Sequence, residues 1–150
     1  MPITLAAAAS PAFESHKPVQ RVRELIACHP ATAFFQFAKY RIGEAEVEAD
    51  ISLRTDVAIG ATGSRGVLHC LIDCLAQLSS PAHLGMAEVA ELETSFLGPW
   101  RGEPLHGQVR VDLTQGRCAV FTCELSLAES RVCIASAQGT LCSCFGESVE

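Results

Sequence analysis

The chain has 150 residues, of which 49% are hydrophobic and 19% are charged, and its formal net charge at pH 7 is -6. This length and this share of apolar residues predict one globular domain over residues 1–150 and exclude general disorder. The negative charge and the lack of any Lys/Arg block argue against nucleic-acid binding, which needs a basic surface. No apolar stretch has the length of a membrane span, so we expect a soluble, cytoplasmic protein without a membrane partner.

The N-terminal part of the chain predicts a tail, a helix and a hairpin. Residues 1–16 lack the basic region of a secretory signal, so we expect a flexible tail. Apolar residues three or four positions apart predict an amphipathic helix over 18–28, which ends where His29 precedes a proline. Aromatic content over 33–40 and alternation of charged and apolar residues over 44–53 predict two antiparallel strands.

The stretch from Gly63 to Leu78 is the part around which we expect the rest of the chain to be arranged. Its glycine-flanked start predicts a turn that opens a helix, and its apolar residues over 67–78 leave no polar stripe. A helix that is apolar on every side is buried, and this one is too short to cross a bilayer. It carries one carboxylate, Asp73. Because a buried ionisable group is costly unless it is paired, Asp73 is the first indication of a functional site.

The remainder of the chain predicts strands. Apolar patterns over 89–97, 105–113, 118–127 and 131–143 indicate four strands, which we expect to form a meander of successive hairpins. The sequence contains no repeat and no linker that would divide it. The predicted fold class is therefore α+β, with an antiparallel sheet of about five or six strands wrapped around one buried central helix.

Eight cysteines invite a disulfide or metal interpretation. None of them forms a Cys-x-x-Cys pair, which zinc sites usually contain, and most occupy apolar positions of the predicted elements. We therefore expect reduced and mostly buried thiols, as is usual in the cytosol, with no disulfide and no metal.

The order of these elements resembles the hotdog-fold acyl-CoA thioesterases, and most of all the phenylacetate-type and hydroxybenzoyl-CoA-type thioesterases. The resemblance extends from about Phe34 to Ser143 and rests on the hairpin, the glycine-rich loop, the helix motif from Gly66 to Asp73 and the strand 91–99. It implies the hotdog fold, in which an antiparallel sheet wraps around a central helix. It also implies a homodimer or homotetramer that acts on an acyl-CoA or acyl-carrier thioester, with CoA as part of the substrate and no cofactor.

The resemblance also implies roles for residues on the helix. In this family an acid on the helix acts on the thioester as nucleophile or as general base, and here it falls on Asp73, seven residues after Gly66. A backbone N–H at the helix start polarises the thioester carbonyl, and the matching donor is the N–H of Arg65. The position of the family histidine holds Ser64, and the first glycine position holds Arg65. The hydroxyl position one turn after the acid holds Gln77.

Physical reasoning from the residues leads to related expectations. The unpaired N–H groups at the start of the helix, around Arg65 and Gly66, favour a developing oxyanion, and Asp73 can supply a base. His69 and Gln77 lie four residues before and after Asp73, so each can share its helix face. His69 either pairs with Asp73 and so compensates for the missing family histidine, or it packs at a dimer interface or forms a structural pair. Gln77 orients either a water molecule or the carboxylate.

Two functions remain open from the sequence. The first is an acyl-CoA or acyl-carrier thioesterase, which the retained Asp73 favours. The second is a non-catalytic module that binds acyl thioesters or has a regulatory role, which the missing family histidine and the missing family Asn or Gln favour. Ser64 is then a helix cap, and Arg65 is available to a phosphate or a carboxylate. A hydratase or dehydratase ranks below both.

Overall fold

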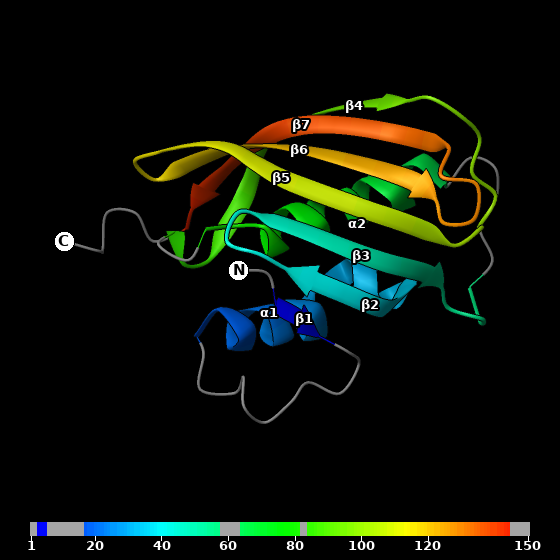
Figure 1. The fold of residues 1–150 in the computed structure, drawn as a ribbon, viewed down its shortest axis with the longest axis horizontal. Helices are drawn as coiled ribbons and strands as arrows, with labels where there is room; N and C mark the ends of the chain where they lie inside the picture. Colours follow the sequence, from blue (N-terminus) through cyan, green and yellow to red (C-terminus); the bar gives the residue numbers. More distant parts are fainter. Residues whose placement is uncertain (1–2, 6–16, 58–63, 82–83, 145–150) are drawn as a thin grey trace.

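The computed structural model describes residues 3–5, 17–57, 64–81 and 84–144, and these form one curved sheet with a helix along it (Figure 1). In chain order, the elements are β1 (Ile3–Leu5), α1 (Lys17–Cys28), the 3₁₀ helix η2 (Pro30–Ala33), β2 (Phe35–Ile42), β3 (Glu46–Leu53), α2 (Ser64–Leu78), β4 (Ala87–Phe96), β5 (Leu105–Gln115), β6 (Cys118–Leu127) and β7 (Cys133–Ser143).

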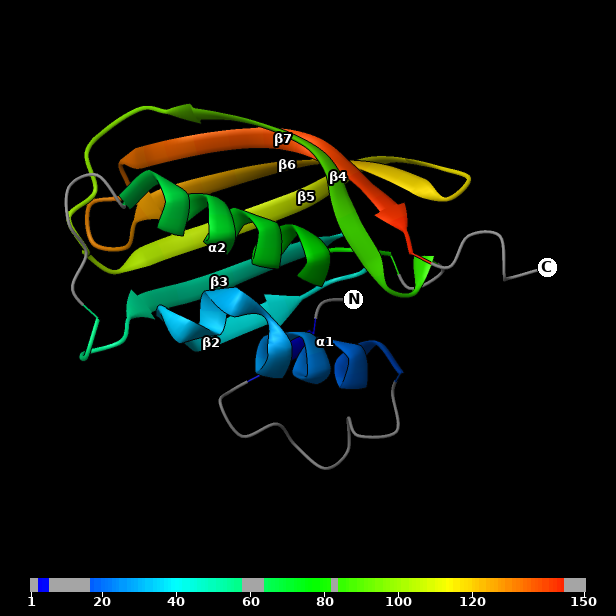
Figure 2. The ribbon, with the colours of Figure 1, turned by 180° about the vertical axis from the view of Figure 1, so that it is seen from behind.

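The strands form one antiparallel sheet in the order β1-β2-β3-β5-β6-β7-β4. The sheet curves around α2, and α1 lies on the β2 side of the molecule next to α2 (Figure 2). The predicted hairpin is present as β2 and β3, where Phe35 lies opposite Leu53 and Ile42 lies opposite Val47. The predicted α+β architecture with one central helix is therefore confirmed.

The position of β4 differs from the predicted meander. β4 does not form a hairpin with β5 but pairs with β7, with Ala87 opposite Ser143 and Phe96 opposite Ala135. Of the four strands of the predicted meander, only β5, β6 and β7 follow one another as hairpins. Gly139 permits the close approach of β4, because a Cβ atom at this position would lie 2.1 Å from the carbonyl oxygen of Glu91. The meander prediction was wrong for β4 because an alternating pattern identifies a strand but not its neighbour.

The N-terminal tail also differs in part from the prediction. Residues 3–5 form β1, which pairs with β2 and adds a short strand at that edge of the sheet, with Ile3 opposite Ile42. Residues 6–16, the larger part of the predicted tail, lie outside the described residues. A strand of three residues is too short to show a hydrophobic period, so the sequence offered no signal for it.

The two sides of α2 differ in burial. The side that faces the sheet is buried, and a Cβ atom on Gly107 of β5 would lie 2.6 Å from a methyl group of Leu75, so this glycine allows the helix to pack closely. The expectation that the helix is buried on every side is wrong for the opposite side, because the sheet covers only one side. The residues buried along α2 are Leu68, Leu71, Ile72, Cys74, Leu75, Ala76 and Leu78.

The structure also bears on the cysteines, on metal binding and on membrane-spanning helices. All eight cysteines lie within the described residues and are free thiols. In the described parts of the chain, no three His, Cys, Asp or Glu side chains come together in a way that would hold a metal ion. No helix in those parts is both long and apolar enough to cross a membrane.

Candidate functional site

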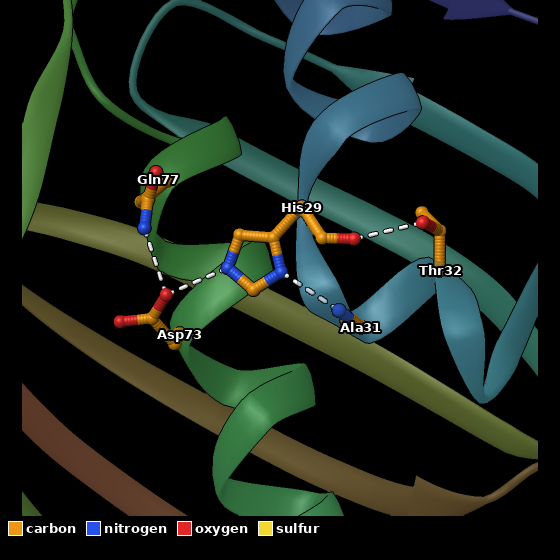
Figure 3. A network of polar contacts seen from close by, with 5 residues as sticks. All are labelled: His29, Ala31, Thr32, Asp73 and Gln77. Carbon is orange, nitrogen blue, oxygen red and sulfur yellow. Dashed lines mark hydrogen bonds and ion pairs between the residues drawn. The ribbon is translucent and has the colours of Figure 1, made fainter.

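Asp73 lies near the middle of α2, on the side of the helix that is turned away from the sheet, and its side chain is 36% exposed. One carboxylate oxygen, Oδ2, accepts two hydrogen bonds. The Nε2 atom of His29 donates over 2.7 Å, and the Nε2 atom of Gln77 donates over 2.7 Å (Figure 3). Both bonds go to Oδ2, and the other oxygen, Oδ1, points away from both donors. The carboxylate is thus fixed through one oxygen only.

His29 sits between α1 and η2, and its ring is held by the adjacent backbone. Its Nδ1 atom accepts a hydrogen bond of 3.0 Å from the backbone N–H of Ala31, in the position of a helix N-cap. Since a nitrogen that accepts a hydrogen bond carries no proton, the proton of the neutral ring lies on Nε2, which donates to Asp73. The residue is only 7% exposed. The local backbone therefore sets which nitrogen of His29 faces the carboxylate.

A second group of side chains lies toward β4. The guanidinium of Arg65 lies over the ring of Phe96, 5.0 Å from its centroid. The ring of His69 also packs on Phe96, with 5.3 Å between centroids. Of the alternatives for His69, a pair with Asp73 is not formed, because the His69 ring packs on Phe96 of β4 while His29 and Gln77 hold the carboxylate. The alternative that Gln77 orients the carboxylate agrees with the geometry.

The structure divides the predicted site residues between two hollows. One, of about 380 Å³, lies between α1 and α2 and is lined by Leu25, Cys28, His29, Pro30, Cys70, Asp73 and Gln77. The other, of about 340 Å³, lies between the start of α2 and the end of β4 and is lined by Ser64, Arg65, Leu68, Phe96, Leu97, Gly98, Pro99 and Trp100. Gly66 and His69 line neither hollow. The chain therefore brings Gln77 to Asp73 but keeps Ser64 and Arg65 apart from it.

Two thiols lie close to Asp73 along α2. Burial, and to a smaller extent the negative charge of Asp73, raises the pKa of the Cys70 thiol. The same two effects raise the pKa of Cys74 to about 12. A thiol acts as a nucleophile in its ionised form, so neither cysteine competes with Asp73 for this role near neutral pH.

His29 is the site residue that sequence reasoning missed. The His29-Pro30 pair indicated only the end of a helix, which is correct as far as α1 is concerned. A histidine before a proline can also cap the N–H group two residues later, and that local signal was available. Its partner Asp73, however, lies 44 residues further along the chain, so the contact depends on how α1 packs against α2.

Comparisons with known proteins identify the fold. The sequence matches no family model and no curated protein. The E. coli PaaI protein, from the phenylacetic acid degradation operon, superposes with a TM-score of 0.68 at 17% identity, over 88% of this chain and 96% of PaaI. A thioesterase family protein from Silicibacter pomeroyi gives 0.62 at 20% identity, over 83% of this chain and 96% of its own. A conserved protein from Pseudomonas aeruginosa superposes with a TM-score of 0.66 at 17% identity, over 80% of this chain and 97% of its own.

The chain has the hotdog fold. In this hotdog fold α2 is the central helix, and the curved sheet covers its apolar side. Asp73 therefore projects from the side of the central helix that the sheet does not cover, where α1 and η2 contact α2 and His29 reaches the carboxylate.

Proposed function

We propose that the protein is an acyl-thioester hydrolase in which Asp73 acts on the thioester carbonyl group, either as nucleophile or as general base for water. The observation that carries this proposal is the geometry of Asp73. It is a half-exposed carboxylate on the central helix, it is held through Oδ2 by two donors, and its Oδ1 is directed away from them. The proposal is supported by the shared fold with the thioesterase family protein of Silicibacter pomeroyi.

The chemistry requires a group that attacks and a group that stabilises negative charge. Asp73 Oδ1 can attack the carbonyl carbon to form an anhydride and release the thiolate, after which water hydrolyses the anhydride. Alternatively it takes a proton from a water molecule that attacks in its place. Both routes place negative charge on the carbonyl oxygen. The first N–H groups of α2, at Arg65 and Gly66, have no partner within the helix and favour such a charge.

The distance along α2 supports a site that two copies of the chain complete. Arg65 and Asp73 are eight residues apart, which is about 12 Å along a helix axis. A reacting carbonyl group must lie about 3 Å from both the attacking oxygen and the N–H donor. Because one helix cannot meet both conditions, we propose a homodimer in which the start of α2 from one protomer faces Asp73 of its partner.

The free edge of the sheet provides a surface for this dimer. β4 ends the strand order, so within the described residues one of its edges has no neighbouring strand. Met86 and Leu97, next to its two ends, are 58% and 60% exposed. An unpaired edge readily pairs with another chain. Light scattering at micromolar concentration should return at least twice the chain mass of 16.0 kDa, and a mass of 16.0 kDa would contradict this arrangement.

A non-catalytic module that binds acyl thioesters is the second candidate. It is favoured by the side chain of Arg65 at the start of α2, where the guanidinium lies against Phe96 in the hollow between α2 and the end of β4. In such a module Asp73 would serve to hold α1 against α2. The two candidates make opposite predictions about turnover.

The experiment that tests the proposal is a screen of thiol release from short, medium, long and aromatic acyl-CoAs. Asp73→Asn keeps the shape and removes the base, so it should lower kcat by about 10²- to 10⁴-fold while acyl-CoA affinity changes little. His69→Asn is the matched control on the same helix and should retain most of the activity. Near-full activity in Asp73→Asn would refute the assignment. Tight binding of acyl-CoA by the wild type without turnover on any substrate would favour the binding module.

A further inference from the structure

We infer that His29 is a positioning residue for Asp73, which acts as a neutral Nε2–H imidazole, holds Oδ2 and leaves Oδ1 as the reacting oxygen. This inference rests on the proposed function for its consequence, but its geometry can be tested separately. It assigns a role to the turn between α1 and η2, which otherwise only connects a helix to the sheet.

The first step of the argument is the fixed tautomer of the ring. Both ring nitrogens of His29 are engaged, since Nδ1 accepts from the Ala31 N–H at 3.0 Å and Nε2 donates to Asp73 at 2.7 Å. If a proton were added at Nδ1, two donors would face each other and the bond to Ala31 would be lost. His29 therefore cannot take a proton from water without breaking its own cap. This excludes it as the general base and leaves that task to the carboxylate.

The second step is the rigidity of the support. The backbone N–H of His29 donates to the carbonyl oxygen of Leu25 at 2.8 Å, and the hydroxyl of Thr32 donates to the carbonyl oxygen of His29 at 2.7 Å. Ala31, which donates to the ring, is fully buried. The imidazole is thus held through its main chain and through Nδ1, and Nε2 is aimed at a fixed point in space (Figure 3).

The third step is the convergence of two donors on one oxygen. Gln77 reaches Oδ2 from the next turn of α2, whereas His29 reaches it from a different element. Two donors from two directions restrict rotation of the carboxylate about its last torsion. A fixed carboxylate presents Oδ1 in one orientation, and such preorganisation raises kcat rather than substrate affinity.

Two substitutions of His29 test the roles of its two ring nitrogens separately. His29→Asn places an amide oxygen near the position of Nδ1, so it keeps the cap on Ala31 but cannot reach Asp73. His29→Gln is longer and places its amide nitrogen near the position of Nε2, so it restores a donor to Oδ2. We expect His29→Asn to lower kcat about tenfold with little change in KM, and His29→Gln to recover most of that loss. His69→Asn, on the Phe96 side of the helix, is the matched control.

Nitrogen-15 NMR of the histidine rings tests the tautomer without any substrate. The His29 signals, assigned by their absence in His29→Gln, should show a protonated Nε2 and an unprotonated Nδ1 at neutral pH. A proton on Nδ1, or wild-type kcat in His29→Asn, would overturn the inference. If the wild type hydrolyses no thioester, the proposed function fails. The NMR result then still decides whether His29 holds the carboxylate in the stated form.

A second, independent observation concerns a pair of thiols on the outer side of the sheet. Cys118 of β6 and Cys142 of β7 lie directly opposite each other, with 2.9 Å between their Sγ atoms. The next pair along the ladder is hydrogen-bonded, because the N–H of Ser143 donates to the carbonyl oxygen of Arg117 at 2.8 Å. Cys118 and Cys142 therefore form a non-hydrogen-bonded pair, in which facing side chains approach most closely and Cα separations of about 4.5 Å suit a disulfide.

We propose that this pair is a site of oxidative modification by low-molecular-weight disulfides, the class to which oxidised glutathione belongs. One cysteine thiolate attacks a sulfur of the glutathione disulfide, which forms a mixed disulfide and releases one glutathione thiolate. The second cysteine thiolate then attacks the protein sulfur of the mixed disulfide and releases the second glutathione thiolate. Two protein thiols are oxidised and one glutathione disulfide is reduced, and the two protons that the protein thiols lose are taken up by the two released glutathione thiolates, which leave as two thiols.

Intact mass and peptide mapping test this proposal on the full chain. Incubation with oxidised glutathione should remove two hydrogen atoms from the protein mass and join the peptides of Cys118 and Cys142, and dithiothreitol should reverse both changes. In Cys142→Ser we expect a stable glutathione adduct on Cys118 instead. Cys144 is exposed and is the nearby competitor. A bridge to Cys144, or no bridge at all in the wild type, would overturn the proposal.

Discussion

The two sides of the central helix α2 do different work, although their residues alternate along the same fifteen positions. The side toward the sheet carries Leu71 and Leu75, which are fully buried and belong to the hydrophobic core. The opposite side carries Asp73 and Gln77, which are half-buried, and Oδ2 of Asp73 accepts hydrogen bonds from both Gln77 and His29. The first side determines how strongly the domain is held together, and the second determines what can react. The difference shows that stability and proposed chemistry can be changed separately within one helix.

The largest expected effect comes from a substitution on the side of α2 that faces the sheet. Leu75→Ala should lower the free energy of unfolding by about 2–5 kcal/mol, because it removes buried methyl groups and leaves a cavity. The control on the other side is Gln77→Ala, which removes one hydrogen bond and should cost about 1 kcal/mol. Urea unfolding measures both. Under native conditions Leu75→Ala should keep its kcat per folded molecule and Gln77→Ala should lose part of it, so the opposite ranking of kcat would contradict the division.

The second prediction compares two cysteines of α2, Cys74 and Cys70. Cys74 is fully buried, and burial raises its pKa from 9.0 to about 12, whereas the pKa of Cys70, which lines the hollow at Asp73, is raised less. The folded state therefore keeps the Cys74 thiol neutral while the unfolded state ionises it. This contribution to stability is complete below pH 9 and is lost as pH rises toward 12, by roughly 2–3 kcal/mol at pH 11.

Chemical unfolding of the wild type, Cys74→Ala and Cys70→Ala at pH 8 and pH 11 measures this loss. Cys74→Ala should lose less stability than the wild type between the two pH values, because the group that ionises on unfolding is gone. Cys70→Ala should resemble the wild type more closely. If all three proteins lost the same stability between pH 8 and pH 11, ionisation of Cys74 would not separate it from Cys70.

The fold and part of the site could be predicted from the sequence. The helix at Asp73 and the hairpin follow from local periodicity, and the Gln77 contact follows from helical spacing alone. His29 and the partner of β4 could not be found in this way, since both depend on residues far apart in the chain. His69 shows a third limit. Helical spacing places it near Asp73, but which neighbour it meets depends on where Phe96 comes to lie.

The smallest expected effect concerns the Phe96 contacts beside the polar side of α2. Arg65→Gln should cost about 0.5–1 kcal/mol, because the cation–π contact with Phe96 is near the surface. A double-mutant cycle with Phe96→Leu isolates the interaction of the pair from the other contacts of each residue. A coupling energy of zero in that cycle would mean that the ring does not hold the guanidinium.

The place of β4 in the sheet has a consequence for the order in which the protein is made. β4 precedes its partner β7 in the chain and therefore leaves the ribosome first. The two strands pair with Phe96 opposite Ala135 and Ala87 opposite Ser143. The hairpins of β5, β6 and β7 can pair as they emerge, whereas β4 must wait for β7, which takes on the order of several seconds at ordinary rates of synthesis. During that interval Val89, Leu92 and Phe96 lack the strand that later lies beside them. The sheet can therefore take up β4 only after β7 has been made.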